Sequence, residues 1–156
     1  RSDRRRASGH HALRTGWLFT DEHVDAASAL ALLSSHSKIK VAFSNPSFDF
    51  WLYLHYKLYD VPQNGSNREI HRLLARCSGF AEFGDKDKRI TGARALELLP
   101  RIKTACTNAR TLGKLCATDK CAHKRGTKPN CGALDQDPSS GMWRLLESLR
   151  VLPLLT

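Results

Sequence analysis

The feature that most constrains this fold is the segment VAFSNPSFDFWLYLHY, residues 41–56. Its first residues complete a short apolar run, IKVAF, typical of a buried strand, so we predict a strand over 39–43. Asn45 is a favourable helix N-cap, and Pro46 suits the first position of a helix. A strand that leads at once into a buried, aromatic helix is therefore predicted.

The predicted helix places Asp49 and His55 among many aromatic rings. A histidine on the apolar face of a helix is usually a hydrogen-bonded core residue. The alternative is that His55 is catalytic and that this segment forms the floor of an active site. The sequence leaves both interpretations open.

A second strand is predicted over 16–20, GWLFT, followed by a helix over 21–37 whose first turn is acidic. A strand, a helix and a strand in succession form a βαβ unit with parallel pairing and a right-handed crossover. The predicted fold class is α/β, with a small parallel sheet followed by a mainly helical C-terminal half.

Polar residues follow both predicted strands and should meet at one edge of this sheet. Asp21 and Glu22 follow the first strand, and adjacent carboxylates of this kind can hold Mg²⁺. The alternative is an acidic first helical turn without further function. Ser44 and Asn45 follow the second strand, where free backbone N–H groups could receive a phosphate.

The rest of the chain alternates helices and loops within one predicted domain, 15–156, after a basic, flexible tail over 1–14. Apolar spacing predicts helices over 67–77, 93–112 and 139–150, the second of them interrupted at Pro100. The closing helix should turn Met142, Leu145, Leu146 and Leu149 inward. Residues 78–92 and 113–138 are predicted loops.

The chain carries a net charge of +10, which suits a polyanionic partner such as nucleic acid. Residues 101–128 hold eight Lys or Arg against one acidic residue, so they are a candidate track for phosphates. A solvated basic face is the alternative. The members that we predict to contact nucleic acid are Arg101, Lys103, Arg110, Lys114, Lys124 and Arg125.

The five cysteines are an odd number, which argues against a disulfide framework and favours a reducing, cytoplasmic compartment. Four of them and one histidine (Cys106, Cys116, Cys121, His123 and Cys131) cluster in the sequence without a standard zinc spacing, so zinc is not expected. No apolar run is long enough to cross a bilayer, and no membrane partner is expected.

Three segments resemble one known family. VAFSNPSFDFWLYLHY resembles the central motif of RloB-like proteins, and WLFTDEH, residues 17–23, resembles the acidic motif that precedes it. NARTL, 108–112, with DPSSGMWRLLESL, 137–149, resembles the closing segment of the family. The order and the approximate spacing of the three segments also agree.

The resemblance implies a Toprim-type fold and a Mg²⁺-dependent nuclease of bacterial phage-defence (abortive infection) loci, often encoded beside an AAA-type ATPase. On this basis Asp21 binds the metal, Glu22 assists, and Ser44, Asn45 and His55 shape the site. The substrate is DNA or RNA.

The sequence departs from the family pattern at Thr20, where an acid is expected, and no residue matches the glutamate of the family's first strand. An N-terminally truncated member would explain this. A non-catalytic nucleic-acid-binding module and a zinc-stabilised interaction module remain as alternatives.

Overall fold

The computed structural model describes residues 27–28, 31, 40–84, 86–115 and 136–151. The predicted strand over 16–20 and most of the predicted loop over 113–138 lie outside these residues. Of the predicted helix over 21–37, the structure describes Ala27, Ser28 and Ala31, and all three are helical.

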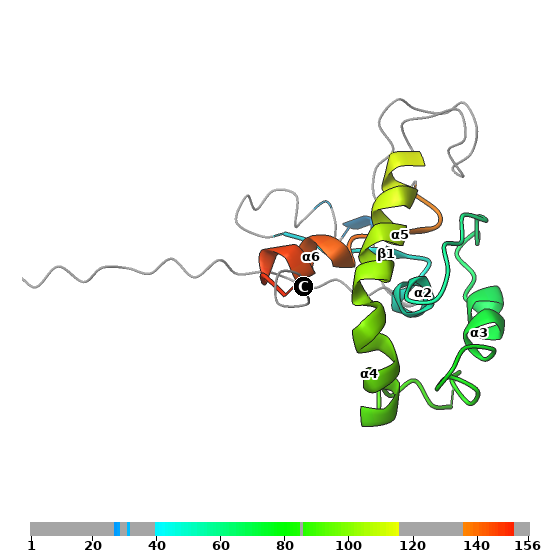
Figure 1. The fold of residues 1–156 in the computed structure, drawn as a ribbon. Helices are drawn as coiled ribbons and strands as arrows, with labels where there is room; N and C mark the ends of the chain where they lie inside the picture. The colour runs from blue at the N-terminus through cyan, green and yellow to red at the C-terminus, as the bar shows by residue number, and fades with distance from the viewer. Residues whose placement is uncertain (1–26, 29–30, 32–39, 85, 116–135, 152–156) are drawn as a thin grey trace, which may run out of the picture.

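The described residues combine helices with one small two-stranded sheet, so the predicted α/β class is confirmed (Figure 1). The sheet is antiparallel. Along the chain the elements are β1 (Ser44–Asn45), α2 (Phe48–Leu54), α3 (Arg68–Leu74), α4 (Gly92–Leu98), the 3₁₀ helix η1 (Leu99–Arg101), α5 (Ile102–Leu115), β2 (Ser139–Ser140) and α6 (Met142–Ser148).

Helix α2 begins two residues later than the sequence predicts. Its N-cap is Ser47, whose backbone is extended and whose hydroxyl oxygen accepts the N–H of Asp49 at 3.2 Å. The prediction that Asn45 caps this helix was therefore wrong. A serine hydroxyl in this position satisfies one of the free N–H groups of the first turn, as asparagine would.

The strand also begins later than predicted, at Ser44, just beyond the range 39–43. It pairs with β2 in the register Ser44 to Ser140 and Asn45 to Ser139. The two backbones continue close together, because the N–H of Gly141 donates to the carbonyl of Phe43 at 2.6 Å. A side chain at Gly141 would place its Cβ 3.2 Å from both the N and O atoms of Phe43. Glycine is therefore favoured at this close approach of two backbones.

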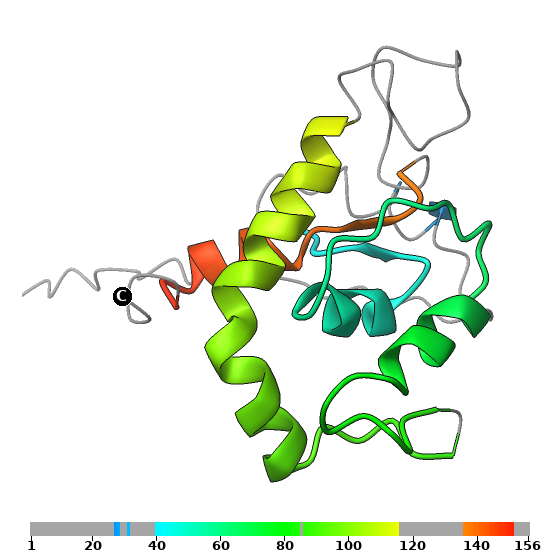
Figure 2. The same ribbon diagram turned by 45° about the vertical axis from the view of Figure 1, so that its right-hand side comes forward.

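Helix α2 lies at the centre of the core, with α5 along one side and α3 along another (Figure 2). Phe50 and Leu54 of α2 are completely buried. Helix α4, η1 and α5 follow one another as one long rod (Figure 1). The predicted interruption at Pro100 is confirmed, and it takes the form of the 3₁₀ helix η1. The segment 78–92, predicted as a polar loop, also contributes two core side chains, Phe80 and Phe83.

The closing helix α6 buries Met142 and Leu145, with Leu146 partly buried against the core. Leu149 was predicted to point inward, which was wrong, because its side chain is 57% exposed. Leu149 is the C-cap residue of α6, and it lies at an end of the helix where residues 147–150 are all exposed. Within the described ranges, no helix has both the length and the apolar character needed to cross a membrane.

Candidate functional site

The corner between β1 and α2 brings together several of the residues that the sequence singles out. The Ser44 hydroxyl is buried and lies 2.8 Å from the Ser140 hydroxyl on the opposite strand. The Ser140 oxygen also accepts the N–H of Met142 at 3.4 Å. Ser44 therefore joins the two strands, while the neighbouring Asn45 is half-buried opposite Ser139.

A cluster of three charged or titratable side chains lies beside this corner. A carboxylate oxygen of Asp49, in the first turn of α2, is 2.6 Å from Nε2 of His71 in α3. The same oxygen is 3.4 Å from the Lys88 ammonium in the segment 78–92. Asp49 is only 6% exposed, and a buried carboxylate is costly unless it is paired. Here two partners from different parts of the fold pair with it.

Sequence reasoning found Asp49 but neither His71 nor Lys88. His71 belongs to a short helix with ordinary amphipathic spacing, and Lys88 belongs to a basic loop, so neither stands out. The start of α3 is fixed to the start of α2 because the Ser47 hydroxyl donates to the Asn67 side-chain oxygen at 2.7 Å. This bond holds the elements that carry Asp49 and His71 in register.

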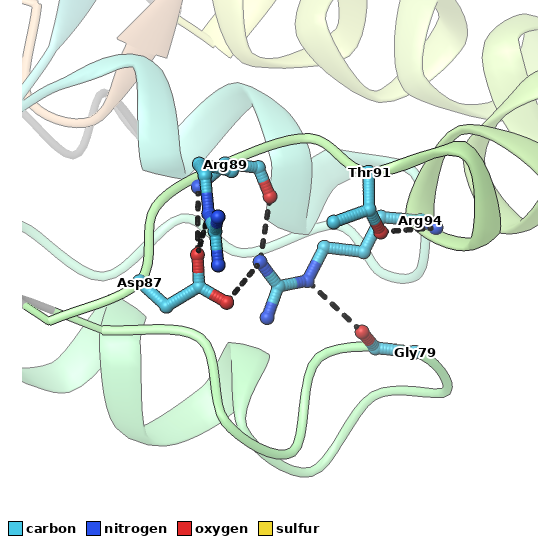
Figure 3. Close-up of polar contacts among 5 residues, drawn as sticks. All are labelled: Gly79, Asp87, Arg89, Thr91 and Arg94. Carbon is cyan, nitrogen blue, oxygen red and sulfur yellow. Dashed lines mark hydrogen bonds and ion pairs between the residues drawn. The ribbon is translucent and has the colours of Figure 1, made fainter.

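The segment that carries Lys88 is organised by Arg94 of α4 (Figure 3). Arg94 is 5% exposed, and its guanidinium donates to the carbonyls of Arg89 at 2.6 Å and Gly79 at 3.2 Å. It also donates to the Asp87 carboxylate at 3.3 Å. The hydrogen bond from the Arg89 side chain, helped by nearby charges including Arg94, lowers the pKa of Asp87. Because Asp87 and Arg89 flank Lys88, these contacts fix the backbone on both sides of it.

The same guanidinium lies between two aromatic rings of the core. Its central carbon is 5.6 Å from the centre of the Phe80 ring and 5.3 Å from that of Phe83. The Phe83 ring in turn meets His71 edge-on, at 6.3 Å between centroids. Arg94 is therefore connected by packing to the cluster around Asp49.

His55 occupies a core position at the end of α2. Its side chain is buried, its Nδ1 lies 3.0 Å from the carbonyl oxygen of Trp51, and its ring meets the Trp51 ring edge-on at 4.9 Å. Burial lowers the pKa of His55 below its ordinary value, although the backbone hydrogen bonds oppose this. The neutral ring therefore donates from Nδ1, which is the arrangement of a structural histidine.

We expect this buried histidine to make folding sensitive to acid. Because the pKa of His55 is lower in the folded chain than in the unfolded chain, protons bind preferentially to the unfolded state. The free energy of unfolding should fall as the pH drops below about 6.5, the unfolded value. His55→Asn, which keeps a donor for the Trp51 carbonyl, should weaken this dependence in urea titrations at several pH values. Identical pH slopes for the two chains would contradict the assignment.

Two of the six basic residues predicted to contact nucleic acid instead contact other residues of the protein. Arg101 donates to the carbonyl of Glu97 at 2.5 Å and lies over the ring of Tyr56. Arg110 forms an ion pair with Glu147 and lies over the ring of Trp143. These arginines hold helices together, so less of their charge faces solvent.

Of the other four residues predicted to contact nucleic acid, the structure describes two. Lys103 and Lys114 are exposed on α5, while Lys124 and Arg125 lie outside the described residues.

The predicted metal ligands Asp21 and Glu22 also lie outside the described residues. Within the part that is described, no group of three His, Cys, Asp or Glu side chains could hold a metal ion. Asp49, the carboxylate nearest the corner along the chain, is already engaged by His71 and Lys88. A magnesium ion at this corner would depend on Asp21 and Glu22, whose adjacent carboxylates suit its preference for a few oxygen ligands and water.

The cysteine cluster is only partly described. Cys106 is 1% exposed in the core face of α5, where burial raises the pKa of its thiol. Such a thiol behaves as a small apolar core residue. The other members of the cluster (Cys116, Cys121, His123 and Cys131) lie outside the described residues.

These features define an α/β protein with a small sheet, a strand-to-helix corner and, beside it, a buried carboxylate paired with a partly buried imidazole. The sequence model of one family, described as RloB-like protein, matches residues 17–149. The chain therefore belongs to the RloB-like protein family, and the resemblance seen in its motifs is confirmed. No curated protein and no solved structure shows significant similarity to the chain.

Proposed function

We propose that this RloB-like chain is a Mg²⁺-dependent nuclease, or a nuclease-like component, that acts on nucleic-acid phosphodiesters in bacterial phage defence. The observation that carries the proposal is the family match, which spans the acidic motif, the Ser-Asn-Pro corner and the closing segment together. The net charge of +10 supports a polyanionic substrate. An AAA-type ATPase is the proposed regulatory partner.

The structural premise is a parallel, Toprim-like arrangement in which residues 16–20 lie beside the segment that leads into β1. Parallel strands end at the same edge of a sheet, so this pairing would bring Asp21 and Glu22 to the corner formed by Ser44 and Asn45. The pairing of β1 with β2 on its other edge is compatible with this, because a strand can accept two neighbours.

Each residue then has a chemical role. Asp21 is the proposed metal ligand and Glu22 assists it. The bound cation supplies stabilisation of negative charge on the phosphate oxygens. The corner before α2 orients the substrate through Ser44 and Asn45 of β1. Lys103 and Lys114, which are exposed on α5 and lie about 16 Å apart along its axis, hold flanking phosphates.

His55, Arg101 and Arg110, in contrast, support the site by holding α2, α5 and α6 in place. Their contacts with Trp51, Glu97 and Glu147 are within the protein.

The decisive experiment incubates the full chain with supercoiled plasmid DNA and, separately, with labelled single-stranded RNA. Cleavage of either substrate in Mg²⁺, and its absence in EDTA, is the expected result. Binding without cleavage in both conditions would overturn the nuclease assignment and favour the non-catalytic binding module. Elemental analysis of the purified chain should find well under half an equivalent of zinc, since a structural zinc site would be nearly full.

A further inference from the structure

A concave site is lined by α3 and by the segment that precedes it, and its residues are distant in sequence from the predicted metal ligands. It is an open pocket of about 450 Å³, within the range that small-ligand sites occupy. One wall is Tyr59 and Val61, from the segment between α2 and α3, and the other is Arg68, Glu69 and Arg72 of α3. The lining therefore combines an aromatic ring with the charged side chains of a helix.

The wall opposite α3 is held in place before any ligand binds. The Asp137 carboxylate accepts the backbone N–H of Gln63 at 2.9 and 3.0 Å and that of Asn64 at 2.5 Å. The Gln63 side chain donates to the carbonyl of Val61 at 2.6 Å. The Tyr59 ring meets the Tyr53 ring edge-on, at 5.9 Å between centroids. A site whose walls are already ordered loses little entropy when it binds.

Three exposed arginines that repeat every four residues form a basic stripe: Arg68 and Arg72 belong to α3, and Arg76 follows its C-cap residue, Ala75. Within the helix this spacing puts Arg68 and Arg72 on one face, about 6 Å apart along the helix axis. The Arg72 guanidinium is engaged by the Glu69 carboxylate, which raises the pKa of Arg72 and lowers the pKa of Glu69. Among the described residues, Arg68 and Arg76 have no such ion pair, so they supply the net positive charge of this stripe.

We propose that this pocket binds one nucleotide of a single-stranded nucleic acid, with its base against Tyr59 and its flanking phosphates on Arg68 and Arg76. The proposal rests on the proposed function and names the form of the substrate. An aromatic face paired with a basic track is how proteins hold single strands. A base inside a duplex is paired with its partner and stacked on both of its faces. It therefore cannot enter a pocket and contact a tyrosine.

The test measures binding by fluorescence anisotropy, with the full chain in EDTA and a fluorescein-labelled oligothymidylate of about ten nucleotides. A duplex of the same length is the competitor. The single strand should bind at least about tenfold more tightly than the duplex, since only an unpaired base can reach Tyr59. Equal affinity for the two would overturn the proposal.

The variants separate the two kinds of contact. Arg68→Gln and Arg76→Gln should each reduce the slope of log affinity against log salt by about 0.7, the value for one lost phosphate contact on a single strand. Arg150→Gln removes the same charge from an exposed position beyond α6 and should leave the slope unchanged. Tyr59→Leu should weaken binding about tenfold without changing the slope, while Tyr59→Phe should bind as the parent does.

The outcomes distinguish this inference from the proposed nuclease activity. Unchanged salt slopes in both arginine variants, with normal thermal melting, would overturn the pocket but leave Mg²⁺-dependent cleavage standing. Binding that follows the expected pattern in a chain that never cleaves would support the pocket and overturn the nuclease.

Discussion

Asp21→Ala is expected to reduce Mg²⁺-dependent cleavage of nucleic acid about a thousandfold. A bound cation contributes several kcal/mol of stabilisation to the charged transition state, and each 1.36 kcal/mol is a factor of about ten in rate. Removing the carboxylate that holds the cation should therefore cost most of that contribution. The measurement is the initial rate of cleavage at saturating Mg²⁺, compared between the parent chain and the variant.

The matched control is Asp60→Ala, which removes an exposed carboxylate of the same type at a position remote in sequence from the acidic motif. Its cleavage rate should equal that of the parent. Glu22→Gln should fall between the two, because the proposed role of Glu22 is to assist rather than to hold the metal. An Asp21→Ala chain that cleaves at the parental rate would show that the metal is held elsewhere or is not needed.

The helices could largely be predicted from the sequence, because burial on one face leaves a periodic apolar pattern that does not depend on distant residues. Helix α5 illustrates this, since Ala105, Ala109 and Leu112 are all buried as their spacing predicts. Its boundary with α4 was predictable for a similar reason, because Pro100 cannot continue the hydrogen bonding of the preceding turn.

The small sheet could not be predicted in the same way. Strand β2 consists of two serines, which have little intrinsic preference for strands, and β1 contains a serine and an asparagine. Their pairing depends on the close approach of Gly141 to the backbone of Phe43, two segments that are far apart in the chain. Only the folded structure brings these residues together.

The cluster around Asp49 was predictable only in part for the same reason. Asp49 stands out because it is a carboxylate in an aromatic segment, but its partners come from α3 and from the segment 78–92. Nothing in the local pattern links His71 or Lys88 to it. Arg94 orders this region, but in the sequence it looks like any charged residue near the start of a helix.

Arg94→Met is expected to lower the free energy of unfolding by about 3 kcal/mol, because it removes a buried charge that satisfies several acceptors. Methionine keeps much of the volume between Phe80 and Phe83, so the loss should come from the carbonyls of Gly79 and Arg89 rather than from a cavity. Urea denaturation followed by circular dichroism measures the effect.

Two further substitutions assign the effect to the geometry of the guanidinium. Arg94→Lys keeps the charge but cannot reach the Gly79 carbonyl, the Arg89 carbonyl and the Asp87 carboxylate together, so it should recover only part of the loss. Arg89→Met removes a side chain that is 83% exposed and should change stability little, although it also breaks an ion pair with Asp87. If Arg94→Met unfolded at the same urea concentration as the parent, water would have to satisfy those carbonyls, and the segment that carries Lys88 would owe its conformation to other contacts.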